Sequence, residues 1–495
     1  MERKLTELIS AITVKSVTGP SEAVITSLVC DSRKASQGCM FVAVRGVAVD
    51  AHKFIPQVTA QGLAAAVVCE ELPPDPDPAV SYILTDDSSK ALAKLASQWY
   101  GRPSEKLKLV GVTGTNGKTT TATLLYEMAR ALGHKAGLIS TVKIIIGTQE
   151  TPAEVTTPDH ITLNALLAQM VEAGCEYAFM EVSSHACHQH RIDGLRFAGG
   201  IFSNLTRDHL DYHKTAENYL RAKKMFFDQL PADAFALVNA DDKNGPVMLQ
   251  NTAAKRYTYS LRAMADFRGK IIESHLNGTL LSLDGHEVEV LFTGRFNAYN
   301  LLSVYGASLL LGFPPEQVLL SMSALTPVAG RFQTFLSPRG YTAIVDYAHS
   351  PDALVNVLSA IREVAAGCGK IITVVGAGGN RDKGKRPLMA REAARLSDKI
   401  ILTSDNPRFE DPEEILNDMA AGLDTEASLR AIRITDRREA IKAATQMAAK
   451  GDVVLVAGKG HENYQDVRGV KRHFDDSEVI SQIFSAEKAI SQNQN

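Results

Sequence analysis

The chain has 495 residues, a length that predicts about three domains because compact domains contain roughly 100–200 residues each. Its 53 basic and 56 acidic side chains give a formal net charge of −3, which disfavours a general polyanion binder and excludes nucleic acid as an expected partner. A hydrophobic fraction of 45% with 22% charged residues is typical of globular proteins and argues against a disordered, fibrous or coiled-coil chain.

The first residues predict an amphipathic helix, with apolar side chains at Leu5, Leu8, Ile9 and Ile12. No apolar core of a signal peptide is present, and the longest apolar runs are too short to cross a bilayer. We therefore expect a cytoplasmic protein without membrane insertion. Six scattered cysteines without a Cys-x-x-Cys pair fit a reducing compartment and indicate neither a disulfide framework nor a structural zinc site. They are Cys30, Cys39, Cys69, Cys175, Cys187 and Cys368.

Short β-branched runs alternate with helical patterns along most of the chain, which predicts an α/β fold with mainly parallel sheets. A segment at 101–106 with Gly and Pro separates a helical pattern from a new strand. A second break lies at 326–331, between a helical stretch at 297–311 and a strand at 342–346. We expect domains over residues 1–104, 105–330 and 331–495.

A predicted strand at 107–113 leads into the sequence GTNGKTT at 114–120, and a helix that ends near Gly133 follows. This order is typical of a phosphate-binding loop, in which backbone N–H groups and a helix N-terminus hold the phosphates of a nucleoside triphosphate. Lys118 would reach the terminal phosphates, and the Thr119 hydroxyl would ligate Mg²⁺. Val112 stands where the strict pattern has its first glycine, and the alternative is an ordinary strand-to-helix turn. The candidate residues are Gly114, Thr115, Asn116, Gly117, Lys118, Thr119 and Thr120.

Polar residues that follow apolar strands are candidate ligand contacts, because ligands of open α/β sheets bind beyond the carboxyl ends of the strands. Glu181 and His209 occupy such positions and are reasonable Mg²⁺ ligands; the alternative is hydrogen bonding within their loops. The histidine-rich segment at 185–190 lacks a second ligand cluster, so Gln189 and Arg191 are favoured there as substrate contacts over a zinc site.

Two further helical segments leave their roles open. The basic residues of 219–226 favour, by chemistry alone, a solvated face of a helix. Asn297 and Asn300 open another helix, and a helix cap explains either as well as a nucleotide contact does.

Four polar loops follow predicted strands in the last third of the chain, at 344–350, 374–381, 402–408 and 455–462. We expect them at one sheet edge. Arg381, Arg408 and Glu462 would complement a small zwitterion, because guanidinium groups bind carboxylates and a carboxylate binds an ammonium. The sequence thus indicates an amino-acid pocket; the alternative is a set of capped turns with surface ion pairs.

These motifs together resemble the Mur ligases, the ATP-dependent, ADP-forming ligases of bacterial peptidoglycan precursor synthesis. The matching segments include TGTNGKTT at 113–120, EVSSH at 181–185, DHLDYH at 208–213, DYAH at 346–349 and GKGHE at 458–462. The resemblance implies an N-terminal domain for the uridine nucleotide of UDP-N-acetylmuramic acid (UDP-MurNAc). It also implies a central P-loop ATPase domain and a C-terminal Rossmann-like domain that brings the amino acid.

The resemblance also implies roles for individual residues. Lys223 matches a lysine that is carbamylated in the family, and this replaces the solvated-face interpretation for that residue. The implied catalytic residues are Lys118, Glu181, His209 and Lys223, and one or two Mg²⁺ ions would be held by Thr119, Glu181, His209 and carbamylated Lys223. Further ATP contacts would be Asn297, Asn300, Arg331 and Asp346. Contacts to the UDP-MurNAc-dipeptide would be Ser32, Arg33, His52, Thr156, Thr157, Ser183, Gln189 and Arg191.

The segment DNPR at 405–408 resembles the family members that add meso-diaminopimelate rather than lysine as the third residue of the stem peptide. The implied reaction joins meso-diaminopimelate to the D-glutamyl γ-carboxylate of UDP-MurNAc-L-Ala-D-Glu through an acyl phosphate. We expect the protein to be a monomer. The implied amino-acid contacts are Arg381, Asp405, Asn406, Pro407, Arg408, Gly458 and Glu462. Ala377 and Asn380 depart from the usual family sequence of their loop.

Three alternatives remain open. A lysine-adding ligase would share the fold but is not expected to carry Arg408. A folylpolyglutamate synthase would not need the N-terminal domain. A non-catalytic scaffold is disfavoured by the presence of Lys118, Glu181, His209 and Lys223.

Overall fold

The computed structural model describes residues 2–46, 49–365 and 369–492, so Cys368 lies outside the described residues. The predicted α/β class with mainly parallel sheets is confirmed. The other five cysteines are free thiols. Among the described helices, none combines the length and the apolar composition needed to span a membrane.

The N-terminal part contains a five-stranded sheet in the order β2-β7-β6-β5-β4. Its strands are β2 (Ser16–Thr18), β4 (Ser27–Val29), β5 (Cys39–Val42), β6 (Ala64–Cys69) and β7 (Ser81–Leu84). Helices α2 (Ile55–Ala60) and α3 (Ser88–Trp99) accompany it. The predicted first helix is shorter than expected, because β1 (Arg3–Lys4) pairs with β3 (Val24–Ile25) and leaves only α1 (Leu5–Ile9). Three short 3₁₀ turns, Ser32–Lys34, Ala51–Phe54 and Pro103–Glu105, complete this part.

The central part is built on an 11-stranded sheet in the order β11-β10-β9-β12-β8-β13-β14-β15-β16-β17-β18. Its parallel centre contains β8 (Lys108–Thr113), β9 (Ala136–Ile139), β12 (Tyr177–Glu181), β13 (Gly199–Phe202), β14 (Phe235–Asn239) and β15 (Lys255–Ser260). Antiparallel hairpins extend both ends, with β10 (Lys143–Ile146) and β11 (Gln149–Pro152) at one end. At the other end are β16 (Phe267–His275), β17 (Gly278–Leu283) and β18 (His286–Val290).

Helices cover both faces of the central sheet, which explains why its inner strands carry apolar side chains on both faces. One core contains side chains of α4 (Lys118–Ala131), α10 (Arg295–Leu310) and α11 (Pro315–Ala324). The other contains α5 (His160–Glu172), α6 (Ser184–His188), α8 (Ala216–Asp228) and α9 (Gly245–Met248). A short helix α7 (Leu210–His213) precedes α8. Gly133 follows α4 with φ +87°, as predicted for a glycine that ends a helix.

The C-terminal part contains a six-stranded sheet in the order β19-β20-β24-β21-β22-β23. Five strands are parallel, namely β20 (Thr342–Asp346), β21 (Ile371–Val375), β22 (Lys399–Leu402), β23 (Ala431–Arg433) and β24 (Val453–Ala457), and β19 (Gln333–Leu336) is an antiparallel edge. One face packs on α12 (Pro351–Val364), α13 (Lys385–Leu396), α14 (Pro412–Ala420) and α15 (Thr425–Leu429). The other packs on α16 (Arg437–Met447) and α17 (Asp476–Gln492), and β25 (Tyr464–Val467) and β26 (Val470–His473) form a hairpin.

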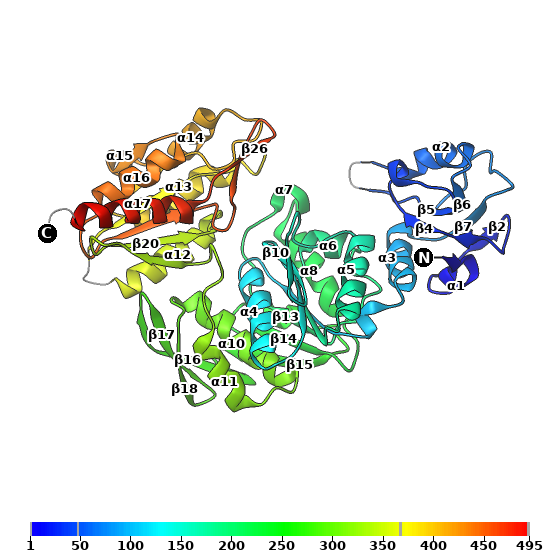
Figure 1. Ribbon diagram of the computed structural model, residues 1–495, viewed down its shortest axis with the longest axis horizontal. Helices are drawn as coiled ribbons and strands as arrows, with labels where there is room; N and C mark the ends of the chain where they lie inside the picture. The colour runs from blue at the N-terminus through cyan, green and yellow to red at the C-terminus, as the bar shows by residue number, and fades with distance from the viewer. Residues whose placement is uncertain (1, 47–48, 366–368, 493–495) are drawn as a thin grey trace.

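Figure 1 shows the N-terminal and C-terminal sheets on opposite sides of the central sheet. The C-terminal sheet contacts the central part near the start of α10, where the rings of Phe296 and Phe332 lie 5.8 Å apart. Gly294 lies close to α12, since a Cβ placed on it would lie 2.8 Å from the Ala360 side chain. The loop that follows β20 is thereby brought toward the loop that follows β8.

Candidate active site

The loop between β8 and α4 has the geometry of a phosphate-binding loop. Gly114 and Gly117 adopt φ +146° and +88°, which side chains rarely tolerate. Neighbouring groups also approach too closely for a side chain: a Cβ on Gly114 would lie 1.9 Å from Ser203 Oγ, and one on Gly117 would lie 2.4 Å from Asn300 Oδ1. Asn204 Oδ1 accepts a hydrogen bond from the Asn116 N–H at 3.0 Å. These contacts hold the loop in shape.

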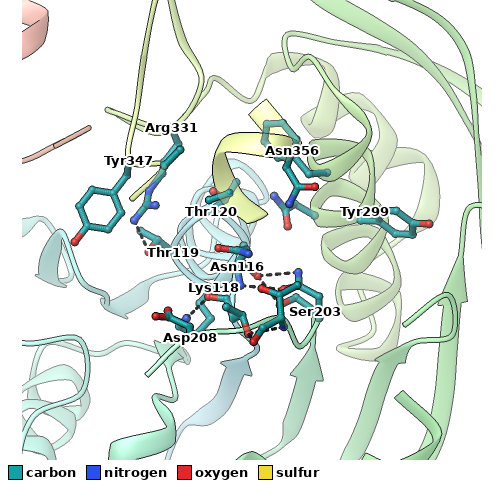
Figure 2. A pocket seen from close by; sticks show the side chains of 18 of the residues that line it. Asn116, Lys118, Thr119, Thr120, Ser203, Asp208, Tyr299, Arg331, Tyr347 and Asn356 are labelled. Carbon is teal, nitrogen blue, oxygen red and sulfur yellow. Dashed lines mark hydrogen bonds between the residues drawn. The ribbon is translucent and has the colours of Figure 1, made fainter. Parts of the chain in front are cut away.

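A cavity of about 500 Å³ opens in front of this loop, within the usual size of a small-molecule site. Figure 2 shows its side chains converging from the central part and from the loop after β20. Most of the predicted nucleotide and catalytic residues line it. They are Thr115, Asn116, Gly117, Lys118, Thr119, Thr120, Glu181, His209, Lys223, Asn300, Arg331 and Asp346, and the predicted substrate contacts Thr156 and Ser183 also line it.

The four predicted metal ligands come from four separate places, which are α4 for Thr119, the end of β12 for Glu181, the residue before α7 for His209 and α8 for Lys223. Glu181 ends β12, is 1% exposed and accepts a 2.7 Å hydrogen bond from the Thr141 N–H. His209 precedes α7 with φ +52°, and the Thr119 hydroxyl accepts a 3.1 Å hydrogen bond from Arg331 Nη2. Within the described residues, no three His, Cys, Asp or Glu side chains gather as a metal site by themselves. This donor set fits Mg²⁺, which takes few protein ligands and completes its shell with water and phosphate oxygens.

Lys223 lies on the buried face of α8 and is 1% exposed. Its Nζ donates a 2.7 Å hydrogen bond to the Gly114 carbonyl and lies 4.7 Å from the centre of the Tyr219 ring. The solvated-face interpretation is therefore wrong for Lys223, although it holds for Arg221, whose side chain is 70% exposed. Burial, and then the charge of Lys118, lower the pKa of Lys223 well below its ordinary value.

The C-terminal sheet contributes Arg331 and Asp346 to the cavity. The Arg331 guanidinium lies 4.5 Å from the Tyr347 ring centre while it donates to Thr119, as Figure 2 shows. Asp346 ends β20, and its Oδ2 accepts a 2.7 Å hydrogen bond from the Phe332 N–H. Burial raises the pKa of Asp346 to about 6, and the nearby Arg331 charge only partly opposes that rise.

The two asparagines of α10 are not helix caps, because the N-cap position belongs to Gly294. Asn300 lines the cavity next to Gly117. Asn297 does not line it, but its Oδ1 accepts a 3.3 Å hydrogen bond from Asn300 Nδ2 and its own amide donates to the Thr293 carbonyl at 2.9 Å. Asn297 therefore orients Asn300.

Gln189 and Arg191 lie outside the residues that line the cavity. Arg191 donates to Gln189 Oε1 at 2.7 Å and to the Thr157 carbonyl at 2.7 Å. Thr157 is buried, and its hydroxyl accepts from the Ser183 N–H at 3.1 Å. These three residues support the segment that presents Thr156 and Ser183. Two of the neighbouring histidines pack on Tyr212, with His188 Nδ1 2.9 Å from its hydroxyl and the His185 ring centre 4.1 Å from its ring centre.

The predicted uridine contacts lie in the N-terminal part, outside the cavity. Arg33 forms a 2.7 Å ion pair with Asp31, and the neighbouring Ser32 begins the same 3₁₀ turn. His52 Nε2 accepts a 3.0 Å hydrogen bond from the Glu70 N–H, which assigns the proton of the neutral ring to Nδ1, 2.7 Å from Asp50 Oδ1.

The predicted amino-acid contacts gather at the carboxyl ends of β21, β22 and β24. Asn406 Nδ2 donates to Glu462 Oε2 at 2.7 Å, and the buried Lys459 Nζ lies 3.2 Å from the same carboxylate oxygen. A Cβ on Gly458 would lie 2.6 Å from Asp405 Oδ2. Burial, and then the charge of Asp405, raise the pKa of Glu462.

Arg381 and Arg408 both approach Gly378. A Cβ on Gly378 would lie 2.9 Å from Arg408 Nη1 and 3.8 Å from Arg381 Cγ. Arg408 adopts φ +53° and directs its Nη1 to the Gly379 carbonyl at 2.8 Å, while Pro407 approaches Gly379 from the facing loop. The Arg408 guanidinium therefore lies beside the loop that carries Arg381, and the Asn406 carbonyl lies near Gly378.

The two residues that depart from the family sequence have structural roles. Ala377 is 3% exposed in the core of the C-terminal sheet. Asn380 adopts φ +53°, a conformation that Asn tolerates better than most residues, and its Oδ1 accepts a 3.0 Å hydrogen bond from the Phe409 N–H.

Several cavity residues were not predicted. Asp241 and Asp242 follow β14, so the strand-end rule that selected Glu181 would also have found them. Asp241 accepts hydrogen bonds from the hydroxyls of Ser260 at 2.7 Å and Tyr299 at 2.8 Å. The sequence carries no comparable signal for Arg262, Tyr299 or Asn356, which also line the cavity.

Known proteins resemble this chain over nearly its whole length. Family models match in three segments, the "Mur ligase family, catalytic domain" at 24–100, the "Mur ligase middle domain" at 112–308 and the "Mur ligase, glutamate ligase domain" at 330–460. A curated protein of Parabacteroides distasonis, named UDP-N-acetylmuramoyl-L-alanyl-D-glutamate--2,6-diaminopimelate ligase, is 62% identical over 98% of this chain and 100% of its own length. A protein of the same name from Bacteroides fragilis is 60% identical over 97% of this chain and 99% of its own length. A solved structure of a ligase with that name has a TM-score of 0.70 and 31% identity, and the match covers 99% of this chain and 100% of that chain.

Proposed function

Because the chain belongs to the Mur ligase family, we propose that it is an ATP-dependent, ADP-forming ligase that joins meso-diaminopimelate to UDP-MurNAc-L-Ala-D-Glu. The observation that carries the proposal is the conjunction of a phosphate-binding loop with a cluster of cationic and acidic side chains at the edge of a different sheet. An ATP-dependent ligase needs both sites, because one substrate is phosphorylated and the other supplies an amine.

The proposed domains are 1–104 for the uridine nucleotide, 105–330 for ATP and 331–495 for the amino acid, and each contains one of the three larger sheets. Ser32, Arg33 and His52 are the proposed uridine-nucleotide contacts of the first. Thr156 and Ser183, supported by Thr157, Gln189 and Arg191, would hold the dipeptide at the cavity.

In the first proposed step, a γ-carboxylate oxygen of the D-glutamyl group bonds to the γ-phosphorus of ATP, and ADP leaves. Lys118 would supply positive charge next to the transferring phosphoryl group, and the N–H groups at the start of α4 would face the phosphates. Asn300, oriented by Asn297, together with Arg331 and Asp346, would position the adenine nucleotide. In the second step the amine bonds to the acyl carbon, loses a proton and displaces phosphate.

Mg²⁺, held by Thr119, Glu181, His209 and a carbamate on Lys223, would neutralise phosphate charge when bound. Carbamate formation joins the neutral Lys223 Nζ to the carbon of CO₂ with loss of one proton. The burial that lowers the pKa of Lys223 favours the neutral amine that this reaction requires. The product is an anion in place of a cation beside the phosphate-binding loop.

The amino-acid pocket would bind the distal end of diaminopimelate, which carries both a carboxylate and an ammonium group. Arg408 and Arg381 would bind the carboxylate, and Glu462 with Asp405 and Asn406 would bind the ammonium. Lysine lacks that carboxylate and would leave Arg408 without its partner. A site of this kind rejects such an analogue by roughly 10⁴–10⁵.

The test is phosphate release by the purified protein with ATP, Mg²⁺ and UDP-MurNAc-L-Ala-D-Glu, with meso-diaminopimelate or L-lysine as the amine. We expect release that requires both the UDP substrate and diaminopimelate. Release with lysine would retain the reaction and overturn the assigned specificity. Nucleotide binding without release in either reaction would instead support a non-catalytic scaffold.

A further inference from the structure

Arg386 is a fully buried arginine at the start of α13, outside the residues assigned to either pocket. Its guanidinium donates two hydrogen bonds to the Glu410 carboxylate, at 2.9 and 3.0 Å. It donates a third to Asp418 of α14 at 2.8 Å, and a fourth to the Gly378 carbonyl at 3.3 Å. These four hydrogen bonds come from Nη1 and Nη2, while the buried Nε has no partner, and the fixed partners of the two terminal nitrogens hold the guanidinium rigidly.

Two of these partners belong to the loops that carry Arg381 and Arg408. The loops contact each other directly, because the Gly379 N–H donates to the Asn406 carbonyl at 2.9 Å and Arg408 Nη1 donates back to the Gly379 carbonyl at 2.8 Å. The Glu410 carboxylate, which Arg386 holds, also accepts a hydrogen bond from the Asn380 N–H. Glu410 therefore joins the second loop to the first.

This junction holds a strained backbone. Arg408 and Asn380 both have φ +53°, a conformation that persists in non-glycine residues only where the surroundings fix it. On one side, the Arg408 N–H donates to the Asp466 carbonyl at 3.0 Å, and the Arg408 carbonyl accepts from the Arg468 N–H at 2.6 Å. On the other side, the fully buried Arg386 holds the half-buried Glu410 through two hydrogen bonds. The direction of the Arg408 side chain depends on both.

We propose that Arg386 is a positioning residue for amino-acid selectivity, which acts through Glu410 to fix the loop that presents Arg408. This inference rests on the proposed function for its kinetic consequence, but its structural part does not. The hydrogen bonds from Arg386 lower the pKa of Glu410 to about 2, so the pair stays ionised at neutral pH. Asp418, the remaining partner, lies on α14 away from both loops and offers a matched control.

The first experiment measures the loops without substrates. Amide hydrogen exchange by mass spectrometry is followed in peptides that cover 376–381 and 405–410, for the full-length protein and the variants Arg386→Lys, Glu410→Gln and Asp418→Asn. We expect exchange at least about tenfold faster in both peptides for the first two variants, and little change for Asp418→Asn, which leaves the Arg386–Glu410 pair intact. Equal exchange in all four proteins would overturn the proposal.

The second experiment measures the selectivity that the loop would control. Glu410→Gln and Arg386→Lys should raise the KM for diaminopimelate about tenfold and reduce its preference over lysine, while the KM values for ATP and the UDP substrate stay within about twofold. An equal rise of the KM values for all three substrates would show a merely structural role and contradict the proposal. Faster loop exchange in a protein that lacks ligase activity would support the positioning role and reject the proposed function, so the two failures are distinguishable.

Discussion

The side-chain nitrogen of Lys223 lies 2.7 Å from the carbonyl oxygen of Gly114, so α8 contacts the first glycine of the phosphate-binding loop. Lys118 Nζ donates to the same carbonyl at 3.0 Å. Two amines therefore share one acceptor in a buried place, where two positive charges disfavour each other. Burial first, and then the charge of Lys118, lower the pKa of Lys223, which leads to the first prediction.

Lys223 lines the cavity, and replacing it by alanine should remove most ligase activity, because the variant cannot form the proposed anionic carbamate. Short carboxylates such as acetate should restore part of it by occupying the vacated space. Phosphate release, with and without added carboxylate, measures both effects, and a ¹³C carbamate resonance after incubation with ¹³C-bicarbonate would detect the modification directly. Arg221→Ala, on the exposed face of the same helix, should retain activity. Full activity of Lys223→Ala would refute the carbamate role.

Replacing Arg408 by alanine should abolish most of the preference for diaminopimelate over lysine. The variant loses the group that lysine would leave unpaired. A site of this kind can provide a preference of roughly 10⁴–10⁵, so the ratio of the two kcat/KM values should fall by several powers of ten. The measurement is phosphate release against the concentration of each amine. An unchanged ratio would show that another residue recognises the distal carboxylate.

Replacing Gly379 by alanine should damage the amino-acid pocket and leave nucleotide binding intact. A Cβ there would lie 1.9 Å from the Pro407 carbonyl oxygen, so the two loops must separate. We expect the KM for diaminopimelate to rise at least about tenfold, with an unchanged Kd for ATP. Gly384→Ala is the matched control, because Gly384 has φ −64° and its nearest neighbour is a flexible side-chain oxygen 3.2 Å away. Equal effects of the two substitutions would contradict the prediction.

Replacing Asp346 by asparagine should change how stability depends on pH. The folded-state pKa of about 6 lies above the ordinary value of 3.8, so the folded protein binds this proton more tightly than the unfolded chain does. Stability therefore falls as the pH rises from about 4 to about 6, and ionised Asp346 costs roughly 3 kcal/mol above that window. Asparagine cannot ionise and keeps an acceptor for the Phe332 N–H.

The free energy of unfolding, measured with denaturant at several pH values, tests this. Relative to the unsubstituted protein, Asp346→Asn should gain roughly 3 kcal/mol between pH 4 and pH 7.5, whatever its offset at pH 4. A difference that does not vary with pH would show that Asp346 has an ordinary pKa in the folded protein.

Local patterns predicted the elements whose signals are contiguous in sequence. The strand at 342–346 coincides with β20, and the strand, glycine turn and helix around Lys118 have the expected order. The first helix is shorter than predicted because pairing of β1 with β3 outcompetes helical periodicity at Arg3 and Lys4. The N-cap of α10 is Gly294 rather than Asn297 or Asn300. Hydrophobic periodicity does not fix the first residue of a helix to better than one turn, so it could not distinguish these positions.

Long-range contacts set the limit of sequence reasoning at the site. Burial of Lys223 depends on α8 packing behind the phosphate-binding loop, and the basic composition of that helix suggests the opposite. Arg386 and Glu410 are 24 positions apart, and no local pattern marks either as a partner of the other. The roles assigned to the substrate contacts stay predictions, and the position of Arg191 behind Thr157 makes its role one of support.

The loops of the amino-acid pocket belong to a sheet that shares no strand with the sheet of the phosphate-binding loop. Substitutions that change which amine is accepted can therefore accumulate without disturbing how the nucleotide is used. Replacing the segment after residue 330 by that of a relative with another preference should transfer the preference, provided that Arg331 still reaches Thr119. The architecture thus makes the choice of amino acid an exchangeable property of one part of the chain, which natural variation and inhibitor resistance could alter separately from catalysis.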